Sequence, residues 1–287
     1  KMTLRLGFIL TLALLSISST PLVIRYVVGV PAIVLAFWRM LTASGLLWAY
    51  SAVKHQGSLT LQQKKLIILA GIFLGCHFAC FFVAVRNTSI ANATFLGCMA
   101  PVFTVVIAFF QKKPNTLFTY LGLALALVGA IIIQASELSI GADNVFGNSI
   151  ALLGAFFISL TFVIAREIRK NTDTITYSRM LFFIAALTLL LISFLSGDFI
   201  FQFQFSHLPW ILFLGFVPSI LGHNLLNYGL KYITPTAITS IPLGEPIIAS
   251  LFGVLLFNES VPGGALIGGP IILIGILIVL LNEPKDQ

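Results

Sequence analysis

The sequence predicts an all-α polytopic membrane protein with ten transmembrane helices, arranged as two inverted five-helix repeats with both termini in the cytoplasm. Three observations carry this prediction: an apolar composition, ten separate apolar runs, and an uneven distribution of Lys and Arg. Hydrophobic residues make up 59% of the 287 residues and charged residues only 9%, with a mean hydropathy of +1.06. Because soluble domains carry about 25% charged residues, the chain is expected to reside in a lipid bilayer.

Ten apolar runs are long enough to cross a bilayer as helices, since about 20 apolar residues span ~30 Å of hydrocarbon. They cover residues 6–28, 32–52, 66–85, 91–111, 116–135, 146–165, 176–196, 209–230, 236–257 and 262–282. The first run is too long for the apolar part of a signal peptide and lacks an A-x-A cleavage site, so it is expected to remain as a helix.

The basic residues indicate the orientation of these helices, because cytoplasmic loops carry an excess of Lys and Arg. With the N-terminus inside, the outer connections hold only Arg25 and Arg86, and two further arginines, Arg39 and Arg179, lie within spans. The other twelve lie at cytoplasmic ends and loops: Lys1, Arg5, Lys54, Lys64, Lys65, Lys112, Lys113, Arg166, Arg169, Lys170, Lys231 and Lys285. The net charge of +7 therefore reflects membrane orientation and predicts no nucleic-acid partner.

The two halves of the chain resemble each other. The segment "FWRML" (37–41) recurs as "YSRML" (177–181), an offset of 140 residues, and His77 matches His223 at an offset of 146. Pro101 matches Pro246 at an offset of 145. We therefore expect two five-helix units, 6–135 and 146–282. Five is odd, so the second unit enters the membrane inverted, which is typical of secondary transporters.

Ten helices, two such repeats, an arginine early in the second helix of each and a proline within the fourth resemble the drug/metabolite transporter superfamily, and its EamA family in particular. The best match is "GEPIIASLFGVLLFNE" (244–259) followed by "GGALIGGPIILIGI" (263–276). The first repeat departs from the pattern, with "QKKP" (111–114) where the family usually has an acidic residue. The resemblance implies a transporter of small organic metabolites, often an exporter, in the bacterial inner membrane.

Glu245 is the first candidate site residue. It lies about ten residues from either end of its span, hence ~15 Å deep by helix rise. An ionisable group at this depth is a functional hypothesis by default. Three roles are open to it: binding a cationic group of the substrate, carrying a coupling proton, or bonding a backbone donor near a proline.

Pro101 and Pro246 interrupt corresponding helices of the two halves, and such paired interruptions are the best sequence pointer to a transporter's binding site. Gly97 and Pro242 lie one helical turn before each proline, on the same face. We expect these four residues to form helix breaks or gates; the alternative is a packing kink.

Polar residues in the other spans complete the candidate set. His77 and His223 either line a cavity or bond a neighbouring helix. Around His223 the pairs His223/Asn227 and Asn224/Tyr228 are each one turn apart and form one polar sector, which we expect to face a cavity. Arg39, beside Trp38, could bind a carboxylate or could be structural, whereas Arg179 lies near the interface. The remaining candidates are Asn92, Thr94 and Cys98 in the fourth helix and the hydroxyls of Ser16, Ser19 and Thr20 in the first.

The sequence thus predicts a secondary transporter of small amphiphilic metabolites that works by alternating access. Amino acids are the first substrate class, because the candidates include both signs of charge. Amine, drug or nucleotide-type substrates, a channel, and an intramembrane enzyme remain as alternatives. G-x-S-x-G, H-E-x-x-H and P-loop motifs are absent from the sequence, and the three cysteines form no metal or disulfide pattern. We expect no cofactor, protons as a possible coupling ion, and a monomer.

Overall fold

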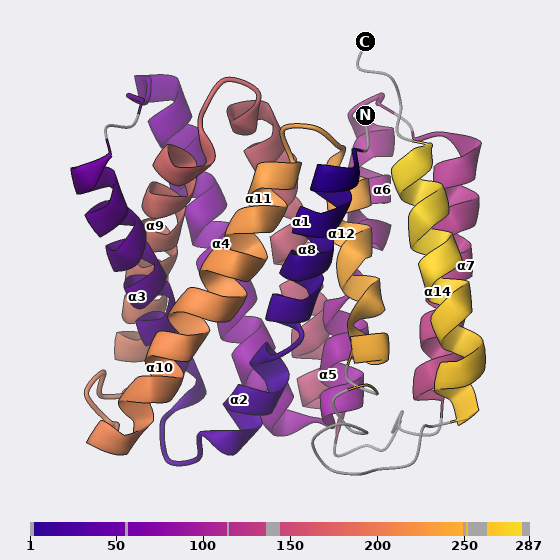
Figure 1. Cartoon of the computed structure of the whole chain (residues 1–287). Helices are drawn as coiled ribbons and strands as arrows, with labels where there is room; N and C mark the ends of the chain where they lie inside the picture. The colour runs from indigo at the N-terminus through magenta and orange to yellow at the C-terminus, as the bar shows by residue number, and fades with distance from the viewer. Residues whose placement is uncertain are drawn as a thin grey trace.

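The computed structural model describes residues 3–54, 57–113, 115–135, 144–248, 251 and 263–282. In these residues the regular structure is entirely helical, and nine segments are long and apolar enough to cross a membrane. The helices run roughly parallel to one another as a single bundle, and both ends of the chain lie at the same end of it (Figure 1). This end is called the termini end below, and the other the far end.

The first half of the chain supplies five spans. Its helices are α1 (Leu4–Ile17), α2 (Thr20–Tyr26), α3 (Ala32–Val53), α4 (Leu61–Asn87), α5 (Ile90–Gly97), α6 (Ala100–Phe110) and α7 (Leu117–Gln134). The first span is divided into α1 and α2, and the fourth into α5 and α6.

The second half begins with α8 (Val145–Arg169) and α9 (Thr174–Leu195). The eighth span is built from η2 (Phe205–His207), α10 (Leu208–Leu214), the π-helix η3 (Gly215–His223) and α11 (Asn224–Gly229). The ninth predicted span, 236–257, begins as α12 (Pro235–Ser240) and the 3-10 helix η4 (Ile241–Gly244), and most of its later part lies outside the described residues. The last helix is α14 (Gly263–Leu281).

Two helices extend beyond the spans that hydropathy predicts. Helix α4 begins at Leu61, five residues before the predicted run, because Thr60 and Gln63 form a capping box that satisfies free N–H groups of its first turn. Helix α8 continues to Arg169, through residues assigned to a connection. Hydropathy marks where the chain leaves hydrocarbon, whereas hydrogen bonding decides where a helix ends, so the predicted boundaries were wrong here.

Contacts at the far end show that the second half is inverted relative to the first. Arg25, at the end of the first span, donates to the carbonyl of Thr88. The Thr88 hydroxyl in turn donates to Asn148 Oδ1, at the start of α8, over 2.8 Å. The sixth span therefore starts at the end where the first span finishes, and the two run in opposite directions.

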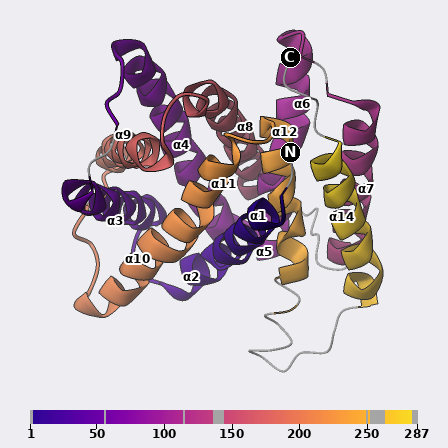
Figure 2. The ribbon, with the colours of Figure 1, turned by 45° about the horizontal axis from the view of Figure 1, so that its top comes forward.

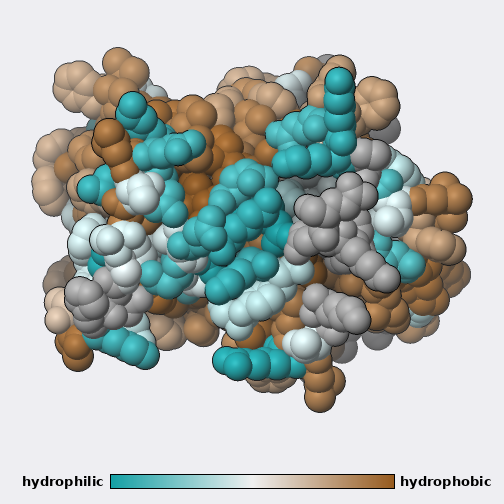
Figure 3. Space-filling model, turned by 90° about the horizontal axis from the view of Figure 1, so that it is seen from above, coloured by the Kyte–Doolittle hydropathy of each residue, from teal (hydrophilic) through white to brown (hydrophobic). Residues whose placement is uncertain are grey.

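The face at the termini end is polar at its centre. Seen from above, hydrophilic residues run across the middle of this face and hydrophobic residues occupy much of its rim (Figure 3). Large apolar side chains such as Phe109, Phe110, Leu266 and Leu273 are exposed on the outside of the bundle. This distribution fits a protein surrounded by lipid, because the outer surface of such a protein is apolar where it meets hydrocarbon.

Helices α7 and α14 lie side by side at one edge of the bundle (Figures 1 and 2). Glycines allow their backbones to approach closely. A Cβ added to Gly129 would lie 2.7 Å from the carbonyl oxygen of Gly268, and one added to Gly268 would lie 2.5 Å from that of Gly129. Small residues are the usual means of close packing between helices in membranes. At positions 129 and 268 the two helices leave no space for a side chain larger than that of glycine.

We predict that Gly268→Ala destabilises the protein by about 1–3 kcal/mol, the usual range for overpacking. The control is Gly45→Ala on α3, where an added Cβ meets nothing within 4 Å. This control should be neutral or slightly stabilising, because alanine is the better helix former. Melting temperatures in detergent would measure both, and equal values for the two variants would contradict the packing argument.

Candidate functional site

Four spans are interrupted near the middle of the bundle, each beside a proline. The interruptions lie between α1 and α2 before Pro21, between α5 and α6 before Pro101, in η3 at Pro218, and in η4 at Pro242. Proline has no N–H and clashes with the preceding turn, so it breaks the regular hydrogen-bond ladder. In the described part of the chain, the fourth span of each repeat is thus interrupted, at Pro101 in the first repeat and at Pro242 in the second.

Side chains satisfy backbone carbonyls at these interruptions. Pro246 cannot donate to the carbonyl of Pro242 four residues earlier, and this carbonyl accepts instead from the Glu245 N–H and from the Cys98 thiol, the latter over 3.2 Å. Pro218 likewise cannot donate to the carbonyl of Leu214, which accepts from the Ser219 hydroxyl over 2.8 Å. Because hydrocarbon offers no water to replace a lost backbone bond, these contacts stabilise the interrupted helices.

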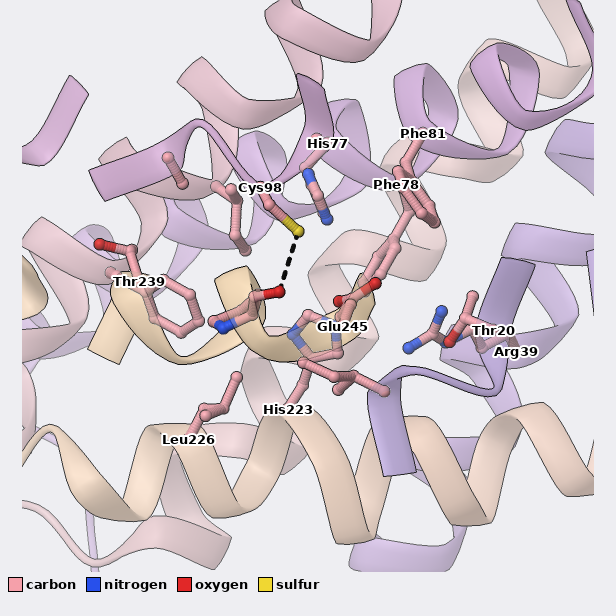
Figure 4. Close-up of a pocket in the computed structure, with 16 residues that line it drawn as sticks. Thr20, Arg39, His77, Phe78, Phe81, Cys98, His223, Leu226, Thr239 and Glu245 are labelled. Atoms are coloured by element: carbon pink, nitrogen blue, oxygen red, sulfur yellow. Dashed lines mark hydrogen bonds between the residues drawn. The ribbon is translucent and has the colours of Figure 1, made fainter. Parts of the chain in front are cut away.

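A cavity of about 60 Å³ lies between the interrupted helices. It is lined by Ile17, Thr20, Arg39, His77, Phe78, Phe81, Gly97, Cys98, Ala100, Ile158, Phe162, His223, Leu226, Thr239, Pro242 and Glu245. Both halves of the chain contribute, and the third span adds the aromatic face of the wall. Figure 4 shows the ionisable side chains meeting around this space, with Glu245 between Arg39 on one side and Cys98 on the other.

Arg39 enters the site from α3 and is only 1% exposed. Its Nε donates to the Ser219 hydroxyl over 2.9 Å, and its guanidinium carbon lies 4.4 Å from the centre of the Phe78 ring. Its Nη2 is buried and has no hydrogen-bond partner among the described residues. A buried guanidinium with an unused donor is costly, which makes this nitrogen a candidate ligand group.

Glu245 follows η4 directly, and its side chain is half-buried at the cavity wall. Arg39 attracts it electrostatically, but no hydrogen bond joins the two side chains. Among the described residues no hydrogen-bond donor contacts the carboxylate. The cavity therefore holds two groups of opposite charge, each with unused hydrogen-bonding capacity.

The two predicted histidines meet at this cavity, with ring centres 6.3 Å apart. His77 Nδ1 lies 2.9 Å from the carbonyl oxygen of Gly154. A carbonyl only accepts hydrogen bonds, so Nδ1 carries the hydrogen, and in the neutral ring Nε2 is an acceptor. The ring of His223 packs edge-on against Phe78, with centres 5.1 Å apart.

The structure separates the rest of the polar sector from the cavity. Asn224 and Asn227 are buried, and Asn227 bonds the hydroxyl of Ser178 through Nδ2 over 3.3 Å. The hydroxyl of Tyr228 bonds that of Tyr232 over 3.2 Å. Of this sector only His223 lines the cavity.

Of the other predicted residues, some line the cavity and others lie outside it. Gly97 and Pro242 line the cavity, whereas Pro101 and Pro246 lie at the interruptions without lining it. Trp38 donates from Nε1 to the carbonyl of Ile200 over 2.7 Å, at the far end. Asn92 donates to Asn148 Oδ1 over 2.9 Å, also at the far end.

Sequence reasoning did not single out the aromatic wall or Thr239. Phe78, Phe81 and Phe162 line the cavity, but the chain has 26 phenylalanines, and an apolar helix gives no sign of which ones face inward. The second span also lines the cavity, through Arg39, which the sequence offered either as a carboxylate ligand or as a structural residue.

The fold and the cavity define a multi-pass integral membrane protein whose two related halves meet around a buried, charged site. The chain matches the EamA-like transporter family over residues 5–135 and 145–281. It belongs to that family, and is therefore a membrane transporter rather than an enzyme.

Several curated transporters are similar to this chain. One from Archaeoglobus fulgidus, uncharacterized, is 29% identical over 202 residues, covering 70% of each chain. YwfM of Bacillus subtilis, also uncharacterized, is 26% identical and covers 94% of this chain and 88% of its own. The pseudopaline exporter CntI of Pseudomonas aeruginosa is 24% identical, covering 89% and 88%. A crystal structure at 18% identity superposes with a TM-score of 0.79 over 98% of this chain and 99% of that one, and supports the fold alone.

We predict that Cys98→Ala destabilises the protein by about 0.5–1 kcal/mol, as is usual for one interhelical hydrogen bond in a membrane protein. Cys98→Ser should be close to wild type, since its hydroxyl can still donate to the Pro242 carbonyl. Melting temperatures of the three proteins would test this. Equal destabilisation by serine and alanine would show that the thiol contributes packing alone.

Proposed function

We propose that this transporter exports small amphiphilic metabolites that carry both signs of charge, with amino acids as the leading class. The observation that carries the proposal is that Arg39 and Glu245 line the same cavity. Arg39 Nη2 has no hydrogen-bond partner in the described part of the chain. It would bind a substrate carboxylate, and Glu245 would bind the ammonium group, since charge-assisted hydrogen bonds are the strong ones in such a site.

The apolar part of the substrate would lie against the aromatic wall. Phe78, Phe81 and Phe162 occupy this side of the cavity. His77 Nε2 offers a further acceptor beside them. A substrate with a charged head and an apolar body fits this division better than a polyanion, because Glu245 would repel a second negative group.

Two sets of arginine contacts support alternating access. At the far end, Arg25 donates to the carbonyl of Thr88, and Arg86 donates to those of Val30 and, over 2.8 Å, Val27. We call this set the far-end tie.

At the termini end, Arg166 donates to the carbonyl of Leu230 and Arg169 to those of Thr172 and, over 2.9 Å, Asn227. We call this set the termini-end tie. Both ties are made here, and a cavity of about 60 Å³ holds only a few waters. The far-end tie joins helices within 6–135, and the termini-end tie joins helices within 146–282. We infer that each tie breaks in turn while the helices that it joins move apart to admit substrate.

The orientation and direction follow from charge and similarity. The Lys and Arg residues of the predicted cytoplasmic loops lie at the termini end, which supports cytoplasmic termini by the positive-inside rule. The similarity to a pseudopaline exporter supports export. We infer that this chain acts in the bacterial inner membrane, as a monomer.

Glu245 supplies a means of coupling export to protons. A protonated carboxyl group has no charge with which to hold an ammonium group, so proton and substrate would exclude each other at Glu245. A carrier with this property exchanges substrate for protons across the membrane. Proton entry would then drive export.

We predict that, in proteoliposomes, an interior-acid pH gradient drives uptake of leucine, because protons leaving the vesicle exchange for substrate entering it. Glu245→Gln should abolish this drive while leucine–leucine exchange survives, since glutamine binds no proton at neutral pH. Arg39→Gln should raise the KM for leucine by about tenfold or more through loss of a charge-assisted contact.

Measuring the uptake of an amine and of a nucleotide alongside leucine would reveal a different substrate class. Uptake of the amine in preference to leucine would contradict the role of Arg39, and wild-type pH dependence in Glu245→Gln would contradict coupling through the carboxylate.

We predict that the ties control access to Cys98, which lines the cavity. In a Cys76→Ser, Cys80→Ser background, Arg86→Gln should expose Cys98 to a membrane-impermeant thiol reagent from the far end. Arg169→Gln should expose it from the termini end. Removing an arginine leaves backbone carbonyls unbonded and weakens that closure by about 1–3 kcal/mol.

The matched control is Arg179→Gln. Arg179 lies 4.3 Å above the Trp48 ring and belongs to neither tie, so its loss should leave the labelling of Cys98 unchanged. Labelling that increases equally from both sides in either tie variant would mean general loosening, and would contradict gating.

A further inference from the structure

Arg39 is held in one orientation within the cavity. The Phe78 ring lies beneath its guanidinium, at 4.4 Å, and Phe82 lies further off, at 5.8 Å. These ring contacts restrain the plane of the group but not its rotation within that plane. Among the described residues, its side chain makes one hydrogen bond, from Nε to the Ser219 hydroxyl over 2.9 Å. This bond fixes that rotation, and with it the direction of Nη2.

The Ser219 hydroxyl is itself oriented by the interruption of the eighth span. It has one hydrogen, which it donates to the carbonyl of Leu214 over 2.8 Å. Its lone pairs are then turned toward Arg39 Nε. Leu214 has this acceptor to offer because residue 218, four positions later, is a proline without an N–H. Ser219 is fully buried, so water does not compete for either bond.

We propose that Ser219 is a positioning residue, which sets the direction of Arg39 Nη2 and thereby the recognition of a substrate carboxylate. This proposal rests on the proposed function, in which Arg39 binds that carboxylate. Two hydrogen bonds thus connect the Leu214 carbonyl, at the interruption around Pro218, through Ser219 to Arg39. The π-helical geometry of η3 at Pro218 therefore helps to set the orientation of Arg39, although Pro218 and Ser219 do not line the cavity. Such π-helical insertions occur frequently at functional sites.

A purely structural role for Ser219 makes a different prediction. If the serine only satisfied a buried donor, its loss would destabilise the protein and affect all substrates alike. If it positions Arg39, its loss weakens only substrates that use the guanidinium. Leucine and leucinamide separate the two, because they share the ammonium group and side chain but only leucine carries a carboxylate.

The test compares Ser219→Ala, Ser219→Thr and Ser159→Ala in proteoliposome flux. Ser159 is the matched control: it is equally buried, and its hydroxyl donates within its own helix, to the carbonyl of Phe156 over 2.6 Å. We expect Ser219→Ala to raise the KM for leucine about tenfold, as for a weakened hydrogen bond to a charged group. The KM for leucinamide and the maximal rates should stay within about twofold of wild type, that is, within ~0.4 kcal/mol.

Ser219→Thr retains the hydroxyl and should restore the leucine KM, and Ser159→Ala should change neither substrate. An equal rise of both KM values in Ser219→Ala would overturn the positioning role. So would a leucine KM unchanged from wild type.

Failure of the proposed function would look different, because wild type itself would then not move leucine, whether or not it moves leucinamide. In that case the ¹⁵N–¹H signal of Arg39 Nε tests whether Ser219 positions Arg39. Positioning requires slow hydrogen exchange at Nε in wild type and Ser219→Thr and fast exchange in Ser219→Ala. Exchange that is the same in all three proteins would overturn the proposal.

Discussion

The need to satisfy backbone carbonyls inside a membrane governs the centre of this protein. Prolines remove N–H groups at Pro101, Pro218 and Pro246, and hydrocarbon supplies no water to replace them. The replacements come from the backbone of the same turn and from side chains: the Pro242 carbonyl accepts from the Glu245 N–H and from Cys98, and the Leu214 carbonyl accepts from Ser219. Each replacement brings a polar group to the middle of the bundle, and the cavity lies where these groups converge.

The charged residues depend on the same interruptions. Arg39 can be buried because Ser219, turned by the Leu214 carbonyl, accepts from its Nε, and because Phe78 lies against its face. Glu245 follows the 3-10 turn of η4 directly, so the change of helix geometry there decides where its carboxylate points. Attraction between the two groups is stronger in a low-dielectric interior than in water. Burial opposes the charge on both groups at the same time, and the empty site leaves both with hydrogen-bonding capacity for a ligand.

Sequence alone predicted the spans, the repeats and four ionisable residues that line the cavity, because each leaves a local mark. An apolar run shows its length, and Glu245 or His77 is conspicuous within one. The partners of a polar residue leave no such mark. His223 and Asn227 share a helical face one turn apart, yet His223 lines the cavity and Asn227 bonds Ser178 and Arg169. Depth along the span separates them, and periodicity does not report depth. The aromatic wall was missed for a related reason, since a phenylalanine facing a cavity and one facing lipid look alike in sequence.

The repeats are symmetric in topology but not in chemistry, and the asymmetry concentrates at the site. The fourth span of both halves is interrupted, but the interruption at α1–α2 has no counterpart in the continuous helix α8, nor has the one at Pro218 in α4. Arg39 faces the cavity, whereas its repeat partner Arg179 lies over Trp48. Duplication therefore supplies two halves that can rock against each other, while divergence within them supplies one carboxylate and one guanidinium. The substrate that we propose, with one charge of each sign, would then bind in one orientation only, which an exactly two-fold site could not enforce.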